Sequence, residues 1–180
     1  MPYSKKPFGV PANVYIIGTM NTADRSVEAL DTALRRRFSF QEICPNPKLL
    51  EDVNYEEVNL PLLLNTINDR IELLIDKDHQ MGHSYFLNIQ SFYDLVETFM
   101  DGIIPLLEEY FYGDFGKIGL VLGSSFIKQK QSKNNKILAQ DFSYDRDFIE
   151  EKELYEFIAS ENWTVQSFQS IYKTIEIENV

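Results

Sequence analysis

The chain has 180 residues, a hydrophobic fraction of 44% and a formal net charge of −11. This length suits one domain or one domain with an appendage, and the 13 phenylalanines are enough to build a core. The acidic balance argues against a general DNA-binding surface, because affinity for duplex DNA comes largely from basic groups that meet phosphates.

The single cysteine, Cys44, excludes an internal disulfide and a cysteine-rich metal site. We expect its thiol to pack in or near the core, where free cysteine is most often found. With only two histidines beside this cysteine, no metal site is expected. No apolar run approaches the roughly 20 residues that span a membrane, and the N-terminus has no signal-peptide pattern. These features favour a soluble protein of the cytoplasm.

The N-terminal part of the chain is predicted to contain two strands and one helix. Residues 13–19 form a continuous apolar run, which is typical of a strand buried on both faces. Ser26 is a suitable N-cap for a helix over residues 27–35. Residues 38–43 alternate between apolar and polar side chains and predict a second strand, which ends before Pro45.

Most of the remaining chain is predicted to be helical. Apolar residues recur at helical spacing over residues 60–75, and Pro61 suits the first turn of this helix. A polar break over residues 76–82 follows. Residues 83–86 then predict a short strand or the entry to another helix.

A second apolar stripe runs from Phe92 to Tyr110 and predicts the core of a helical subdomain. Ser91 and Asp94 form a capping pattern at its start. Pro105 interrupts the stripe, so we expect a kink or a new helix start at this residue.

The last third of the chain is less regular. Glycines at positions 113, 116, 119 and 123 predict a loop-rich region, and the basic residues of 128–133 predict a solvated loop. Helices are predicted over residues 147–159 and 164–173, with Trp163 as a packing anchor.

Polar and basic residues gather after the first predicted strand. Asn21 and Asp24 follow it directly, and Arg35, Arg36 and Arg37 end the helix that comes next. Open α/β sheets bind ligands at the carboxyl ends of their strands. Guanidinium groups match phosphate oxygens bidentately. This pattern predicts a phosphate-binding site.

A purely structural interpretation of the same residues is available. Asn, Thr and Asp after a strand commonly form turns and cap helices. Cations at a helix C-terminus are stabilised by the helix dipole, which accounts for one arginine more easily than for three.

Four sequence strings resemble one family. MNTADRS at residues 20–26 and ALRRRFSF at 33–40 resemble the sensor-1 strand end and the arginine-finger region of an AAA+ nucleotide hydrolase. Within that superfamily, they resemble the McrB-type GTPase subunit of modified-cytosine restriction systems. MGHSYF at 81–86 and IPLLEEYF at 104–111 fit the same family, in the expected order. The resemblance covers roughly residues 10 to 120, and nothing is recognised beyond about residue 125.

The resemblance implies catalytic roles for four residues. Asn21 is implied as the sensor that faces the terminal phosphate and orients the attacking water, since an amide donates and accepts without adding charge. Asp24 would orient its neighbours or pair with an arginine. Arg37 matches the usual finger position, from which it reaches the nucleotide of the next subunit, and Arg36 is the second choice.

The resemblance also implies nucleotide-binding roles for Asn21, Thr22 and Arg25, and for His83 and Ser84 of the lid. His83 and Ser84 lie where a lid approaches the base or the phosphates. The commonest AAA+ pattern has an arginine on a lid helix instead, so a structural lid turn is the alternative interpretation.

Two elements of such a hydrolase are absent from this sequence. It contains no G-x-x-x-x-G-K-[ST] string and no apolar strand that ends in Asp-Glu before the sensor strand. We therefore expect the C-terminal portion of an AAA+ core, of α+β and mainly helical class. The expected domains are a core remnant over residues 1–45, a helical lid over 46–123 and an extension of unknown role over 124–180.

The chain alone is expected to be inactive as a hydrolase. In the complete protein, the resemblance implies GTP, with ATP as the alternative, together with Mg²⁺. It also implies a hexameric ring of identical subunits and an McrC-like endonuclease subunit, with DNA bound only through other domains or subunits. Two other functions stay open, a non-catalytic lid or assembly module and an AAA+ remodelling ATPase.

Overall fold

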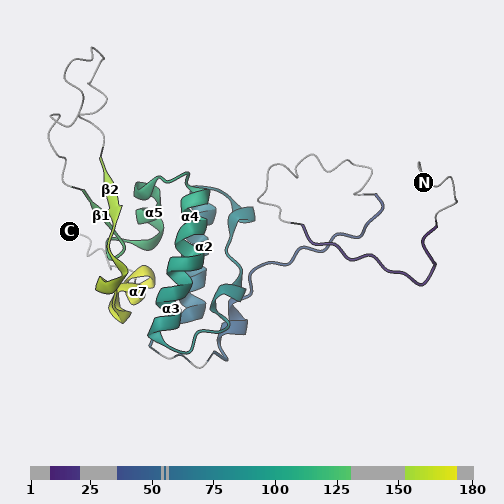
Figure 1. Ribbon diagram of the computed structural model, residues 1–180, viewed down its shortest axis with the longest axis horizontal. Coiled ribbons are helices and arrows are strands. Elements are labelled where there is room, and N and C mark those ends of the chain that lie inside the picture. Colours follow the sequence, from purple (N-terminus) through teal and green to yellow (C-terminus); the bar gives the residue numbers. More distant parts are fainter. Residues whose placement is uncertain (1–8, 21–35, 54, 56, 131–152, 174–180) are drawn as a thin grey trace, which may run out of the picture. The chain divides into compact units, whose positions relative to one another are not determined.

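Helices supply most of the structure of the described residues between 47 and 173 (Figure 1). The computed structural model describes residues 9–20, 36–53, 55, 57–130 and 153–173. The chain divides into two units, Met1–Phe40 and Gln41–Val180. The expectation of a mainly helical fold is confirmed for the described residues.

The two strands expected in the N-terminal part are not formed. Residues 13–19 have no strand structure, and their apolar side chains are exposed, with Tyr15 at 89% and Ile17 at 93%. Residues 38–43 are likewise irregular and exposed. A strand needs neighbours that pair with its N–H and C=O groups. Among the described residues, the only sheet pairs two strands from the C-terminal part of the chain.

Cys44 also differs from its expected position, because its thiol is exposed. It lies in the irregular segment before the 3-10 turn η2 (Pro47–Leu50), and its thiol donates to the Glu42 carboxylate at 3.4 Å. Since this segment forms no strand, the alternation of residues 38–43 does not turn Cys44 toward a core.

Helix α2 (Leu60–Leu74) is the predicted long helix, with Pro61 in its first turn as expected. The Asn59 side chain caps its N-terminus by accepting from the Leu62 N–H at 2.9 Å. Its apolar stripe is buried from Leu60 to Ile71, and the helix packs against η2, α5 and α7. Burial of this stripe, more than intrinsic helix propensity, stabilises the helix.

Helix α3 (Phe92–Thr98), a π-helical turn (Phe99–Ile103) and α4 (Ile104–Tyr110) run on from one another as one continuous rod in Figure 1. Ser91 and Asp94 form the predicted capping box. Pro105 lies in the first turn of α4, which begins one residue before it, so the expected new helix start is confirmed. Pro105 has no N–H to donate, and the Ile104 N–H bonds back five residues to the Phe99 carbonyl.

The glycine-rich region is mostly a helix, α5 (Phe115–Leu122), so the prediction of a loop was wrong there. Gly119 lies inside α5, where an added Cβ would lie 3.3 Å from the Ile127 side chain. The small residue therefore permits close packing rather than a turn. Gly113 and Gly123, with φ of 71° and 91°, do lie in the turns that border the helix.

The C-terminal part contains β1 (Ile127–Gln129), β2 (Tyr155–Phe157), a 3-10 turn (Ser160–Asn162) and α7 (Val165–Tyr172). The strands are antiparallel, with Lys128 opposite Glu156. The prediction of a helix over 147–159 was wrong for the described residues of that range, which contain β2. The prediction of a solvated loop was wrong for Lys128, which belongs to β1. The helix predicted over 164–173 is confirmed.

Aromatic rings join the C-terminal elements to the helical rod. The rings of Phe99 and Phe168 lie 4.9 Å apart, and those of Phe126 and Trp163 lie 5.1 Å apart. Trp163 is 4% exposed, and its indole N–H donates to the Ile158 carbonyl at 3.0 Å, as expected of a packing anchor. Phe126, Trp163 and Phe168 thus share one core with α2 and α3.

Arg70 on α2 links two further helices to this core. Its guanidinium donates to the Val121 carbonyl near the end of α5 at 2.5 Å and to the Ile171 carbonyl near the end of α7 at 2.6 Å. These carbonyls belong to last helical turns, where acceptors lack partners within the helix. Burial lowers the pKa of Arg70, but an arginine side chain stays charged at neutral pH.

We predict that Arg70→Met lowers the free energy of unfolding by about 2 kcal/mol, because two carbonyls lose a charged donor. Arg70→Lys should recover only part of this loss, since one ammonium does not reproduce the planar fork. Urea unfolding followed by circular dichroism measures the effect. Asp69→Asn, at an exposed position of the same helix, is the control. An Arg70→Met variant as stable as the wild type would contradict the proposed link.

Candidate functional site

The turn over residues 81–86 presents two polar side chains between two buried anchors. Met81 is 1% exposed and Phe86 is fully buried. Between them, His83 is half-buried, and Ser84 and Tyr85 are exposed. His83–Phe86 form a 3-10 turn, η4, rather than a strand. Because both ends of the turn are anchored, its outward side chains have a defined position.

Asn68 of α2 fixes the start of this turn. Its amide N–H donates to the Met81 carbonyl at 3.0 Å, and its amide oxygen accepts from the Met81 N–H at 2.7 Å. Asn68 is 5% exposed, so both polar groups are satisfied without water. The sequence patterns did not predict a role for Asn68. The sequence signal that could have identified it is a polar residue one helical turn after Leu64 on an otherwise apolar face of the helix.

One ring nitrogen of His83 already accepts a hydrogen bond. The Asn46 backbone N–H donates to its Nδ1 at 3.2 Å. A nitrogen that accepts carries no proton, so this bond assigns the neutral tautomer with its proton on Nε2. The imidazole therefore offers Nε2–H as a donor, and the neighbouring Ser84 hydroxyl both donates and accepts.

Tyr85 packs against the π-helical turn. A Cβ added at Gly102 would lie 3.0 Å from Cε1 of the Tyr85 ring, which is too close for any larger residue unless the ring moves. π-helical turns occur frequently at functional sites. Here the widened turn and its glycine leave space for the aromatic ring beside Ser84.

A second polar cluster lies near this turn. The Asp76 carboxylate contacts Nδ1 of His79 at 2.7 Å, and the His79 ring meets Tyr110 edge-on at 4.8 Å. His79 is therefore packed, with a side chain only 15% exposed. The hydrogen bond from His79 lowers the pKa of Asp76, and burial raises that of Tyr110.

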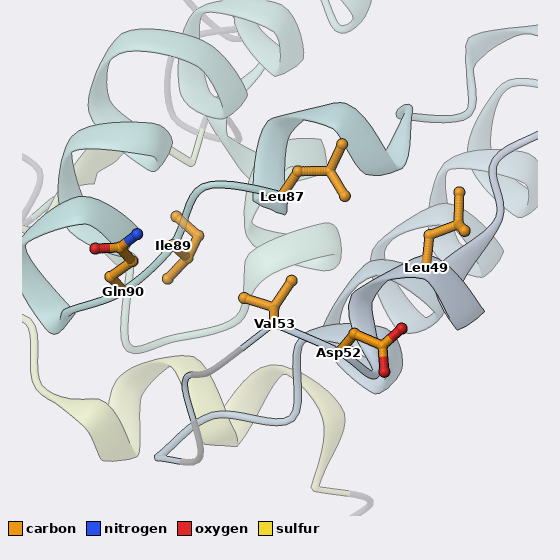
Figure 2. A pocket seen from close by; sticks show the side chains of 6 residues that line it. All are labelled: Leu49, Asp52, Val53, Leu87, Ile89 and Gln90. Atoms are coloured by element: carbon orange, nitrogen blue, oxygen red, sulfur yellow. The ribbon is translucent and has the colours of Figure 1, made fainter.

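An open pocket lies between residues 49–53 and residues 87–90, which follow the 81–86 turn. Figure 2 shows Leu49, Asp52 and Val53 on one wall and Leu87, Ile89 and Gln90 on the other. Neither His83 nor Ser84 lines it. The pocket is therefore separate from the predicted lid contacts.

The structure brings together only part of the predicted site. His83 and Ser84 share one turn, as their adjacency requires. Arg36 and Arg37 are exposed in an irregular segment of the Met1–Phe40 unit. Asn21, Thr22, Asp24 and Arg25 lie outside the described residues. Their roles stay predictions.

The described part of the chain contains no group of three or more His, Cys, Asp or Glu residues that could hold a metal ion. The Mg²⁺ expected with the nucleotide therefore finds no ready-made cluster among these residues. No helix among them is long and apolar enough to cross a membrane.

Residues 59–119 match the family model of the McrB alpha-helical lid domain. The chain is also similar to the type IV methyl-directed restriction enzyme EcoKMcrB subunit of Escherichia coli strain K12. The two are 42% identical over 125 residues, which cover 59% of this chain and 27% of the relative. The chain thus spans about a quarter of the length of that relative.

The lowered pKa values of Asp76 and Asp94 predict acid-sensitive stability. Hydrogen bonds from His79 lower the pKa of Asp76 from its ordinary value of 3.8. Hydrogen bonds from Gln90 and Ser91 lower the pKa of Asp94 from the same ordinary value. A carboxylate whose folded pKa is depressed stabilises the fold fully above its unfolded pKa, and this contribution disappears as pH falls through the folded value.

We therefore expect the free energy of unfolding to fall as pH decreases below about 4. Asp94→Asn should be less stable than the wild type at pH 7 and less sensitive to acid. Urea unfolding between pH 7 and pH 2.5 measures both, with Asp101→Asn, at an exposed position of the π-helical turn, as the control. Equal acid sensitivity in Asp94→Asn and the wild type would refute the assignment.

Proposed function

We propose that this chain, whose residues 59–119 match the McrB alpha-helical lid domain, works in an AAA+ GTPase motor of a modification-dependent DNA restriction system. The family match of the lid is the observation that supports this most directly. The relative named as a restriction-enzyme subunit supports the same role. The assignment of residues 1–45 to an AAA+ core rests on the strings MNTADRS and ALRRRFSF. We also propose that the lid domain spans residues 46–123 and the extension residues 124–180.

In this proposal, Arg37 is the finger that reaches the nucleotide of the neighbouring subunit, and Arg36 supports it. The exposure of both residues in an irregular segment agrees with groups that have to extend to a partner. A guanidinium placed there stabilises the charge that develops on the transferred phosphoryl group. Asn21 orients the attacking water, and Asp24 orients its neighbours.

The lid contributes His83 and Ser84. The Nε2–H of His83 and the Ser84 hydroxyl suit the acceptor atoms of a base or of phosphate oxygens. Thr22 and Arg25 contact the same nucleotide from the core side. Mg²⁺ would neutralise charge on the phosphates, and the described residues offer it no cluster. GTP is the proposed nucleotide, with ATP as the alternative.

The proposed partners are further copies of the same subunit in a hexameric ring and an McrC-like endonuclease subunit. The sequence of this chain contains no phosphate-binding loop, so hydrolysis requires a polypeptide that supplies one. A non-catalytic assembly module and a remodelling ATPase remain alternatives. They differ from the main proposal in the effects of Arg37 substitution and in nucleotide preference, respectively.

We expect Arg37→Ala in the complete hydrolase to lower kcat for GTP by about 10³-fold, because the transition state loses its finger. Nucleotide affinity should stay within about threefold of the wild type. Steady-state GTP hydrolysis and equilibrium binding of a fluorescent GTP analogue measure the two quantities. Arg35→Ala, in the same basic cluster, is the control. Near-normal turnover in Arg37→Ala would remove this residue from the finger role and favour the assembly module.

Asn21→Ala in the same protein should lower kcat by about 10²-fold while changing nucleotide affinity little, since the water loses its orienting group. Single-turnover hydrolysis at saturating GTP separates this chemical defect from weak binding. Equal losses in hydrolysis and binding would mean that Asn21 only shapes the turn.

A further inference from the structure

Asn68 is a polar side chain on the buried face of an apolar helix. Its neighbours one helical turn away on that face, Leu64 and Ile71, are fully buried, and Asn68 itself is 5% exposed. A buried amide is unfavourable unless both of its polar groups are paired. An apolar side chain at this position would avoid that cost, so the pairing of Asn68 calls for an explanation beyond packing.

Both hydrogen bonds of Asn68 go to a single residue on another segment. The amide oxygen accepts from the Met81 N–H at 2.7 Å and the amide N–H donates to the Met81 carbonyl at 3.0 Å. This pairing fixes both the position and the orientation of the Met81 peptide groups, because each bond has a preferred direction. Apolar contacts of the buried Met81 side chain lack such directionality.

The fixed residue lies immediately before the polar part of the turn. His83 follows Met81 by two positions, and its Nδ1 is occupied by the Asn46 N–H at 3.2 Å. Fully buried Phe86 anchors the far end. The position of His83 Nε2 and of the Ser84 hydroxyl therefore depends on the Met81 backbone at one end and on Phe86 at the other.

We infer that Asn68 is a positioning residue, which holds the 81–86 turn so that His83 and Ser84 meet the nucleotide in one fixed geometry. This inference rests on the proposed nucleotide contact of the turn. Asn68 itself touches no nucleotide and acts through the Met81 backbone. A site whose supporting hydrogen bonds are lost can keep its residues and still bind its ligand poorly.

The test compares Asn68→Leu with two controls. Asn65→Leu changes an exposed asparagine of the same helix. Arg70→Met removes the hydrogen bonds to Val121 and Ile171, away from the turn, and serves as a comparator for lost stability. Hydrogen exchange measured in this chain should show that the Met81 amide exchanges about tenfold faster in Asn68→Leu than in the wild type. The two control variants should not show this increase.

In the complete hydrolase, Asn68→Leu should raise KM for GTP by about tenfold with kcat within about twofold, while Arg70→Met leaves KM unchanged. Asn68→Asp, which keeps the acceptor for the Met81 N–H, should fall between Asn68→Leu and the wild type. An unchanged KM in Asn68→Leu, or an equal rise in Asn68→Leu and Arg70→Met, would overturn the positioning role.

The double variant His83→Ala, Ser84→Ala separates this inference from the proposed function. If the double variant raises KM and Asn68→Leu does not, the nucleotide contact stands and only the positioning role fails. If the double variant leaves KM unchanged, the turn makes no nucleotide contact, and the positioning role falls with it.

Discussion

Burial of one face of α2 is the constraint on which the rest of the Gln41–Val180 unit depends. The helix packs against η2, α5 and α7, and its apolar side chains from Leu60 to Ile71 on that face are buried. Two polar side chains extend this packing into directional contacts. Arg70 bonds to carbonyls near the ends of α5 and α7, and Asn68 bonds to the Met81 backbone. The same helix thus organises both the C-terminal elements and the candidate site.

The shared core has a consequence for the limits of the lid. The family match ends at residue 119, yet Phe126, Trp163 and Phe168 pack in the same core as Phe99. The segment without a recognised family therefore has a structural role, because its aromatic rings complete the apolar environment of α2 and α3. Removal of the residues after 123 would expose that core to water.

The candidate site is divided between two kinds of segment. His83 and Ser84 lie on a turn whose ends are buried and whose backbone is bonded to α2. Arg36 and Arg37 lie in an exposed, irregular segment. In a ring motor such a division has a physical purpose, since a lid contact has to be rigid and a finger has to reach another subunit. This purpose belongs to the proposed function.

The sequence by itself determined the elements whose signals are local. The stripe over residues 60–75, the Ser91–Asp94 capping box and the break before Pro105 were all predictable, because side-chain periodicity and capping act within a few residues. The MGHSYF string likewise located His83 and Ser84 in a lid turn. Only the tertiary structure decided the elements that need distant partners. Residues 13–19 have strand character but no described neighbour to pair with, Gly119 lies in a helix where Ile127 approaches it closely, and the Asn68 amide bonds to the distant Met81 backbone.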